Sequence, residues 1–176
     1  MAVTHEHIAT ATAPGGGATS YMEVTAIDQT YDDLEVIIQS KTDASTGAST
    51  CNLTFNGAGG TAYSQTRLRK NGTSMYGGIW TGASSFSVSY ALGPGNGSQM
   101  SGWLRLYIPQ YSSSLSEHPV NWWMTSWDST TAGEMAYTGG LYEGTSAETI
   151  TSIKWLTSGW AIEGDCTMAV YGIKNA

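Results

Sequence analysis

The segment TITSIKWLTSGWAIEGDCTMAVYGI, Thr149 to Ile173, decides the fold class of this chain. Its first part, residues 150–156, is short and rich in β-branched and aromatic side chains, and Thr157-Ser158-Gly159 separates it from a second run. The second run alternates apolar residues with polar or small ones, which is the two-residue period of a strand. Its predicted inward residues are Cys166, Met168 and Val170. The segment therefore predicts two β-strands joined by a turn.

The same alternation recurs along the chain from Tyr21 onward, in eight to ten short runs separated by Gly, Ser, Asn and Pro. The chain holds 21 Ser, 23 Thr and 22 Gly, a composition poor in helix formers, and no helical period continues for ten residues. We expect an all-β fold: an antiparallel β-sandwich with jelly-roll or related Greek-key topology. The predicted core residues are Leu34, Val36, Ile38, Leu53, Phe55, Phe86, Val88, Leu104, Leu106, Met168 and Val170. Arg69-Lys70-Asn71-Gly72 is interpreted as a turn.

The chain of 176 residues is expected to form one domain from residue 21 to residue 176, preceded by an arm at residues 1–20. The arm has few apolar side chains and includes Gly15-Gly16-Gly17, so it is predicted to be a flexible linker. An alternative is that it orders on a neighbouring subunit. In either case the domain should fold without it.

Charge and composition exclude several functions. The net charge of −7 repels a phosphate backbone, so nucleic-acid binding is not expected. Apolar runs are too short to cross a bilayer, and no secretory signal is recognisable, so we expect a soluble chain without a membrane partner. Cys51 and Cys166 are interpreted as buried thiols, with a bridge as the alternative if their strands are neighbours. The three histidines have no zinc-ligand spacing, and neither metal nor cofactor is expected.

Aromatic residues supply the candidate binding site. Three tryptophans crowd one strand, and alternation sends Trp123 and Trp127 to one face and Trp122 to the other. The favoured interpretation is that Trp123 and Trp127 fill the core, because tryptophan is usually buried. If instead Trp122 and Met124 are core, the other two rings are exposed and can stack on sugars. For a glycan-binding protein the site residues would be Trp122, Trp123, Trp127 and Tyr142.

Catalytic signatures are missing from the sequence. There is no nucleophile elbow, phosphate-binding loop or zinc-protease motif. A jelly-roll glycoside hydrolase would need two carboxylates facing each other across a cleft. Four glutamates could face a cleft, but nothing in the sequence selects a pair, so no catalytic residue is predicted. They are Glu35, Glu134, Glu143 and Glu163.

Four short stretches carry a resemblance to a known family. They are Tyr31-Asp32-Asp33-Leu34-Glu35-Val36-Ile37-Ile38, Leu53-Thr54-Phe55-Asn56-Gly57, Ile150-Thr151-Ser152-Ile153 and Val170-Tyr171-Gly172-Ile173-Lys174. Together they resemble the pattern of small virion structural proteins of tailed bacteriophages, which are β-sandwich proteins of capsid surfaces and tail tips. The resemblance implies no catalytic residues.

Three functions are therefore compared. The first is a capsid decoration (cement) protein: a homotrimer made in the bacterial cytoplasm that binds the major capsid protein on the outside of the virion capsid. The second is a receptor- or glycan-binding module of a tail fibre or tail tip. The third is the jelly-roll glycoside hydrolase.

Overall fold

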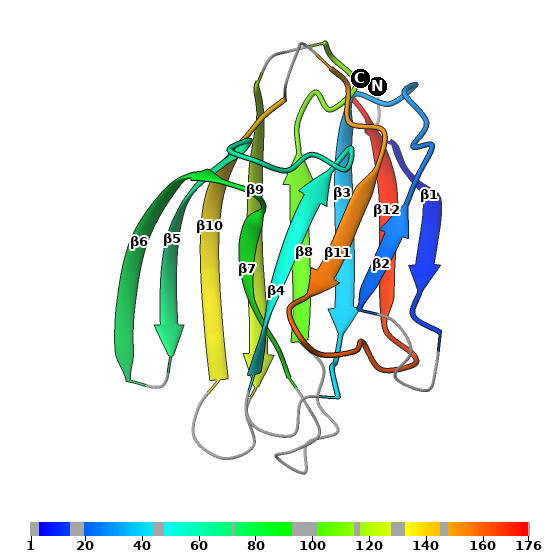
Figure 1. The fold of residues 1–176 in the computed structure, drawn as a ribbon. Coiled ribbons are helices and arrows are strands. Elements are labelled where there is room, and N and C mark those ends of the chain that lie inside the picture. The colour runs from blue at the N-terminus through cyan, green and yellow to red at the C-terminus, as the bar shows by residue number, and fades with distance from the viewer. Residues whose placement is uncertain are drawn as a thin grey trace.

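The structure, a computed structural model, describes residues 4–14, 20–43, 48–71, 73–92, 102–114, 117–127, 133–144 and 148–175. Within these ranges the chain consists of strands and connecting segments, without a helix, and the strands form two antiparallel sheets packed face to face (Figure 1). The expected β-sandwich is confirmed.

The larger sheet has the strand order β1-β12-β3-β8-β9-β10-β5-β6. Its strands are β1 (Thr4–Thr12), β12 (Thr167–Lys174), β3 (Asp33–Ser40), β8 (Gly102–Ile108), β9 (Glu117–Trp127), β10 (Gly133–Glu143), β5 (Tyr63–Asn71) and β6 (Ser74–Ala83). The smaller sheet has the order β2-β11-β4-β7. Its strands are β2 (Tyr21–Val24), β11 (Ile153–Thr157), β4 (Ala48–Phe55) and β7 (Phe86–Leu92).

The strand order is that of a jelly roll with additions. From β2 to β7 the chain enters the two sheets in the sequence small, large, small, large, large, small, as the first six strands of a jelly roll do. The seventh jelly-roll strand is replaced by the meander β8-β9-β10, and β11 returns as the eighth. Strands β12 and β1 extend the large sheet beyond β3. Closing each strand against antiparallel neighbours leaves few edges exposed.

The core lies between the two sheets. All eleven predicted core residues are buried, because each occupies the inward position of an alternating strand. The aromatic side chains of Phe55, Tyr63, Phe86 and Tyr142 pack together there with ring centroids 4.9 to 6.5 Å apart. These distances are typical of edge-to-face and tilted aromatic pairs.

The two strands predicted from the deciding segment do form, but they are not paired with each other. Strand β11 lies in the small sheet and β12 in the large one. Residues 158–166 cross from one sheet to the other, with one bridge from Ile162 to Thr42. The tight turn expected at Thr157-Ser158-Gly159 is thus part of an inter-sheet crossover, and the strand expected from Trp160 begins only at Thr167.

The prediction of a flexible arm is wrong for residues 4–12. These residues form β1, which pairs antiparallel with β12 from Thr4↔Lys174 to Thr12↔Thr167. A β-bulge between His7 and Ala9 brings Ile8, Ala9 and Ala11 against the core. The physical reason is that β12 would otherwise present an open row of backbone hydrogen-bonding groups at the sheet edge. The glycine run expected to be a linker lies outside the described residues.

The turn expected at Arg69-Lys70-Asn71-Gly72 is also corrected. Arg69 and Lys70 belong to β5, where they pair with Tyr76 and Met75 of β6. The strand continues because each basic side chain lies opposite a large side chain of β6, and such cross-strand pairs stabilise a sheet. The resulting β5–β6 hairpin extends past β7 at the left of Figure 1.

The four stretches on which the expected virion resemblance is based meet at one end of the sandwich and hold strand ends in place. The side-chain oxygen of Asn56 accepts hydrogen bonds from the backbone N–H groups of Thr151 and Ser152, at 2.8 and 3.1 Å. The ring of Tyr31 lies on Gly172, where a Cβ atom would come within 2.3 Å of it. These residues are therefore explained by the architecture of the fold.

Replacing Val36 by Asp should lower the free energy of unfolding by several kcal/mol or abolish folding, because Val36 is buried in the central β3 and the new carboxylate has no partner there. Gln39→Asp, on the exposed face of the same strand, is the matched control and should change it little. Urea unfolding followed by tryptophan fluorescence measures both. Equal stability of the two variants would show that the faces of β3 are assigned wrongly.

Deleting residues 2–14 should lower the melting temperature by roughly 5 °C or more, because it exposes the edge of β12 and removes the buried Ala13. Deleting only residues 2 and 3 is the control. An unchanged melting temperature for the longer deletion is what a free arm would give, and it would contradict the pairing of β1 with β12.

Candidate functional site

Two of the four residues expected to bind a glycan are buried. Trp122 packs against Phe86 with ring centroids 5.1 Å apart, and Tyr142 donates a hydrogen bond of 2.5 Å to the carboxylate of Glu148. Burial, together with this hydrogen bond, raises the pKa of Tyr142 well above its usual value. Neither ring can stack on a sugar. For the candidate site of Trp122, Trp123, Trp127 and Tyr142, the prediction is therefore wrong at Trp122 and Tyr142, which are core residues.

The strand β9 has the orientation opposite to the favoured interpretation. Trp122 and Met124 face the core, and Trp123 is half-buried on the outer face of the large sheet. Alternation predicts that two such faces exist but cannot decide which one is buried. The side chain of Trp127 lies outside the described residues. Trp123 is thus the one member of the set whose described position allows surface contact.

The outer face of the large sheet carries a broad hydrophobic surface, here called the outer-face patch. Across the sheet, Leu68 of β5 lies beside Tyr137 of β10, and Tyr137 lies beside Trp123 of β9. Trp123 in turn lies 6.3 Å, between ring centroids, from Trp103 of β8. Adjacent strands are about 4.8 Å apart, so the patch spans roughly 20 Å from β6 to β8. Its members are Leu68, Met75, Ile79, Trp103, Trp123, Met135 and Tyr137.

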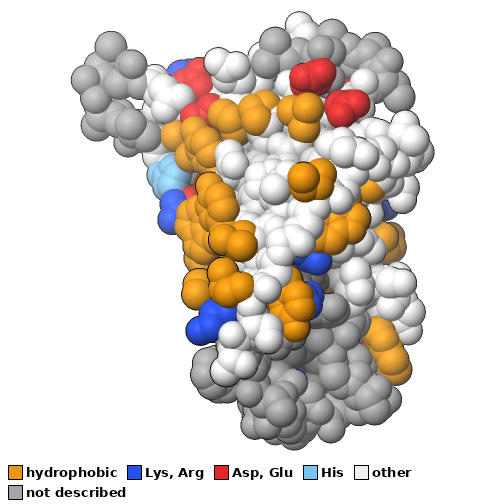
Figure 2. Space-filling model, turned by 90° about the vertical axis from the view of Figure 1, so that its left-hand side faces the viewer, with side chains coloured by type: hydrophobic (Ala, Val, Ile, Leu, Met, Phe, Trp, Pro, Cys, Tyr) orange, Lys and Arg blue, Asp and Glu red, His pale blue; other side chains and the backbone are white. Residues whose placement is uncertain are grey.

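Some side chains of the patch are more exposed than large hydrophobic residues usually are. Ile79 is 75% exposed and Met75 61% exposed, values typical of surface lysine or glutamate and not of core-forming residues. Figure 2, which views the molecule from the β6 side, shows hydrophobic side chains gathered along one side, with basic side chains among and below them. Contiguous apolar surface on a soluble domain is typical of a protein–protein contact.

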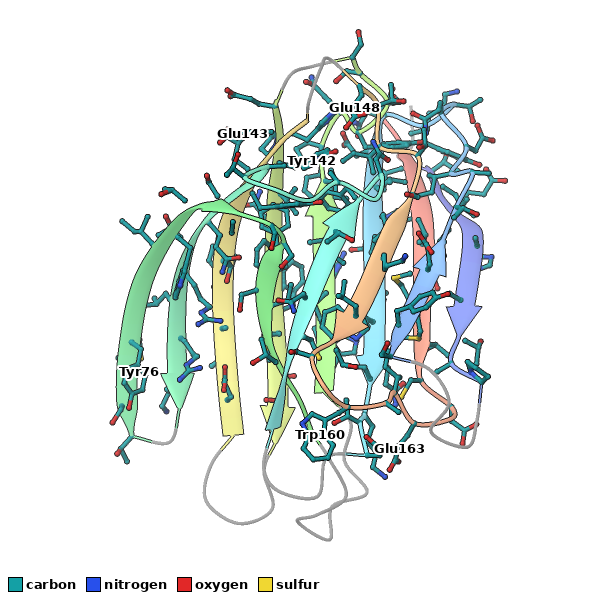
Figure 3. All side chains as sticks on the ribbon, viewed as in Figure 1. Tyr76, Tyr142, Glu143, Glu148, Trp160 and Glu163 are labelled. Atoms are coloured by element: carbon teal, nitrogen blue, oxygen red, sulfur yellow. The ribbon has the colours of Figure 1, made fainter. Side chains whose placement is uncertain are left out.

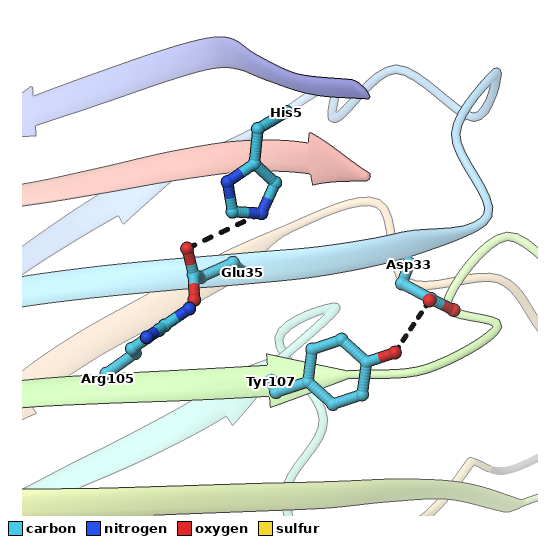
Figure 4. Close-up of polar contacts among 5 residues, drawn as sticks. All are labelled: His5, Asp33, Glu35, Arg105 and Tyr107. Atoms are coloured by element: carbon cyan, nitrogen blue, oxygen red, sulfur yellow. Dashed lines mark hydrogen bonds and ion pairs between the residues drawn. The ribbon is translucent and has the colours of Figure 1, made fainter. Parts of the chain in front are cut away.

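Next to the patch, two charged side chains and a histidine form a row across the outer face, here called the charged row (Figure 4). Glu35 is buried and forms an ion pair with Arg105, while His5 of β1 approaches its other carboxylate oxygen at 3.6 Å. The Arg105 guanidinium also lies over the Trp123 ring, 4.9 Å from its centroid. Arg105 therefore joins the charged row to the outer-face patch and fixes the orientation of Trp123.

A second carboxylate of β3, Asp33, is held by three donors. It accepts hydrogen bonds from Tyr107 Oη at 2.6 Å, Gln110 N at 2.9 Å and Asn175 Nδ2 at 2.8 Å. Burial opposes ionisation of Asp33, but the three hydrogen bonds outweigh it and lower the pKa of this carboxyl. Burial, followed by the bond to Asp33, raises the pKa of Tyr107 to about 12. The pair is an ionised acceptor and a neutral donor, which suits a structural role.

A hollow lies on the opposite, inner face of the β5–β6 hairpin. It has a volume of about 290 Å³ and is lined by Arg67, Arg69, Tyr76, Gly77, Gly78 and Trp80. Figure 3 shows Tyr76 near the free end of this hairpin, far from Tyr142 and Glu148. Among the described strands none of the small sheet lies over this part of the inner face, since β7 is the last strand in that sheet's order. We call this hollow the hairpin groove.

The four candidate catalytic glutamates lie apart. Glu35 faces outward on β3, Glu134 faces inward on β10 beside Arg69, and Figure 3 shows Glu143 and Glu163 at opposite ends of the sandwich. Glu163 forms an ion pair of 2.7 Å with Lys41. No two of the four share a cleft, so the arrangement required for glycoside hydrolysis is not formed by them.

Cys51 and Cys166 are both buried free thiols, as the favoured interpretation expected. Cys51 lies in the small sheet, and the Cys166 thiol accepts a hydrogen bond of 3.0 Å from Lys41 N. In the part of the chain that the structure describes, no group of three or more His, Cys, Asp or Glu side chains is placed to hold a metal ion. Across the same residues, no helix has the length and apolar character needed to cross a membrane.

Comparisons with protein-family models, with curated proteins and with solved structures give no match to this chain.

Replacing Asp33 by Asn should lower the free energy of unfolding at pH 7 by about 1 to 3 kcal/mol, because an amide cannot accept all three hydrogen bonds. Since the pKa of Asp33 is lowered on folding, its contribution is present above the unfolded pKa near 4 and is lost as pH falls through the folded value. The difference between wild type and variant should therefore shrink below about pH 4.

Urea unfolding at a series of pH values measures this difference. The control is Asp165→Asn, which removes the same charge at an exposed position with φ of 67°, a conformation that Asn also adopts. A difference for Asp33→Asn that stays constant down to pH 2, or that matches the control, would contradict the assigned role.

Proposed function

We propose that this chain is a non-enzymatic structural protein of a tailed-phage virion that binds the outer surface of the assembled capsid, with the outer-face patch as its contact to the major capsid protein. The observation that carries the proposal is the patch itself. Seven large hydrophobic side chains on five adjacent strands are held at the surface of a rigid sheet. A cement protein needs such a contact, since burying apolar surface on association is what stabilises a shell from outside.

Rigidity of the strands supports this use of the patch. Side chains on a sheet have fixed spacing, so association costs less conformational entropy than it would for a loop. The charged row of Glu35, Arg105 and His5 borders the patch, as polar rims border hydrophobic interface centres. The resemblance of the strand-end residues to phage virion proteins is a second line of support, since these residues lie outside the patch.

A homotrimer is part of the proposal. Capsids have local threefold positions, and a closed cyclic oligomer lets one interface on each subunit satisfy all three. Light scattering of the purified protein should give three times the chain mass of 18.6 kDa.

The two other functions have less support. A receptor-binding tail module with Trp122 and Tyr142 in its site is inconsistent with their burial. A glycoside hydrolase would need a carboxylate pair, and the four glutamates considered for it lie apart. A tail location remains the alternative outcome of the experiment below.

Purified protein should co-sediment with expanded phage capsids that lack it. Replacing Leu68 and Tyr137 together by Asp should reduce the bound fraction by about tenfold or more, because two charges are placed at the centre of the patch. Thr54→Asp, on the outer face of the small sheet, is the control and should bind like wild type.

Both variants must melt like wild type, which separates lost binding from lost folding. A wild-type protein that ignores capsids and co-purifies with tails would overturn the proposal. Capsid binding that is equally strong for the Leu68/Tyr137 variant would retain the location but reject the outer-face patch as the contact.

A further inference from the structure

The hairpin groove begins where the small sheet ends. Gln65 of β5 donates to Ser87 O at 3.0 Å and accepts from Ser87 N at 2.9 Å, so its side chain completes the edge of β7. The next inward residues of β5 are Arg67 and Arg69, and among the described residues that line the hollow around them none belongs to the small sheet. Two arginines therefore occupy inward positions that hydrophobic residues occupy elsewhere in the sheet. On a sheet face without a covering layer, apolar side chains do not add stability. The missing cover alone does not explain why two arginines lie here or how they are arranged.

Aromatic rings of β6 hold both guanidinium groups in place. Arg67 Cζ lies 4.7 Å from the centroid of the Trp80 ring, and Arg69 Cζ lies 5.3 Å from that of Tyr76. Trp80 in turn lies flat against Gly78, where a Cβ atom would come within 2.3 Å of the indole. A guanidinium that stacks on a ring uses its flat face and keeps its N–H groups at its edge. Arginine binds carboxylate and sulfate through that edge.

Charge is concentrated here against the trend of the whole molecule. Two of the seven basic residues of the chain, Arg67 and Arg69, line the groove, although the net charge is −7. Glu134 approaches Arg69 at 3.7 Å, and the formal charge of Arg67, Arg69 and Glu134 together is positive. In Figure 2 the acidic side chains lie mostly near the top, away from the basic ones lower on the same face.

Spacing and surface chemistry favour a sugar polymer over a nucleic acid. Two residues along a strand separate Arg67 from Arg69 by about 7 Å, which suits acidic groups carried on successive or alternate sugars. Duplex DNA carries one charge per about 1.7 Å of its axis, so the net charge of −7 repels it more strongly than a glycan with one acidic group per sugar. Tyr76 and Trp80 are 51% and 39% exposed and offer apolar surface to sugar C–H groups.

We propose that the hairpin groove binds acidic polysaccharide, with the guanidinium groups of Arg67 and Arg69 holding carboxylate or sulfate groups of the chain and Tyr76 and Trp80 contacting its rings. The groove is on the face of the sheet opposite to the outer-face patch, so this site does not depend on capsid attachment. A volume of about 290 Å³, at the lower end of small-molecule sites, accommodates part of a polymer whose remainder continues into solvent.

Isothermal titration calorimetry of the full chain tests the site with four polymers: polygalacturonate, dextran sulfate, neutral dextran and oligodeoxythymidylate. We expect binding of polygalacturonate, dextran sulfate or both, weakened by salt, and none of neutral dextran. Binding to only one of the two acidic polymers identifies the acidic group that the site prefers. Equal binding of neutral dextran, tighter binding of the oligonucleotide, or no binding of either acidic polymer would overturn the proposal.

Variants locate the site. Arg67→Gln with Arg69→Gln should weaken binding at least about tenfold, whereas Lys154→Gln with Lys174→Gln, the same charge change elsewhere, should weaken it less than about twofold. Arg67→Gln alone leaves the Arg69–Glu134 pair intact and should still weaken binding about threefold, which covers the case in which the double variant does not fold. Equal affinities of the groove and control variants would show that the arginines are structural only.

Discussion

A four-stranded sheet cannot cover an eight-stranded one, and this mismatch is the constraint on which the surfaces of the molecule depend. The small sheet ends at β7, whose edge is completed by Gln65, and in the part of the chain that the structure describes no strand lies over the inner face of the β5–β6 hairpin beyond that residue. Arginines stacked on aromatic rings replace core residues there. The outer face of the large sheet carries the hydrophobic outer-face patch between β6 and β8. One hairpin thus contributes two chemically different surfaces, back to back.

The four stretches on which the expected virion resemblance is based belong to a different part of the structure. Asn56, Tyr31 and Gly172 act where strand ends meet, and each has a contact that explains its identity. Asn56 also adopts a positive φ of 51°, a conformation that Asn tolerates better than most residues. These stretches therefore close the sandwich at one end. The outer-face patch and the hairpin groove lie mainly between residues 67 and 137, outside the four stretches, so their chemistry is inferred from geometry.

Periodicity predicted the core well because each inward residue repeats at every second position, as Val36 and Ile38 do. It could not choose the buried face of β9, where both faces hold tryptophan, and there the packing of Phe86 on Trp122 decides. Strand β10 continues through Gly140, and this glycine admits Phe86, which would come within 2.6 Å of a Cβ atom. The pairing of β1 with β12 and the separation of β11 from β12 are long-range choices that local sequence does not encode.

Cryo-electron microscopy of the intact phage particle tests the central claim most directly. The account predicts trimers on the outside of the capsid, with the outer face of the large sheet against the major capsid protein and Tyr137 and Leu68 buried in the contact. The hairpin groove would then face away from the shell. Density on the tail instead of the capsid, or a capsid-bound molecule whose outer-face patch points into solvent, would contradict it.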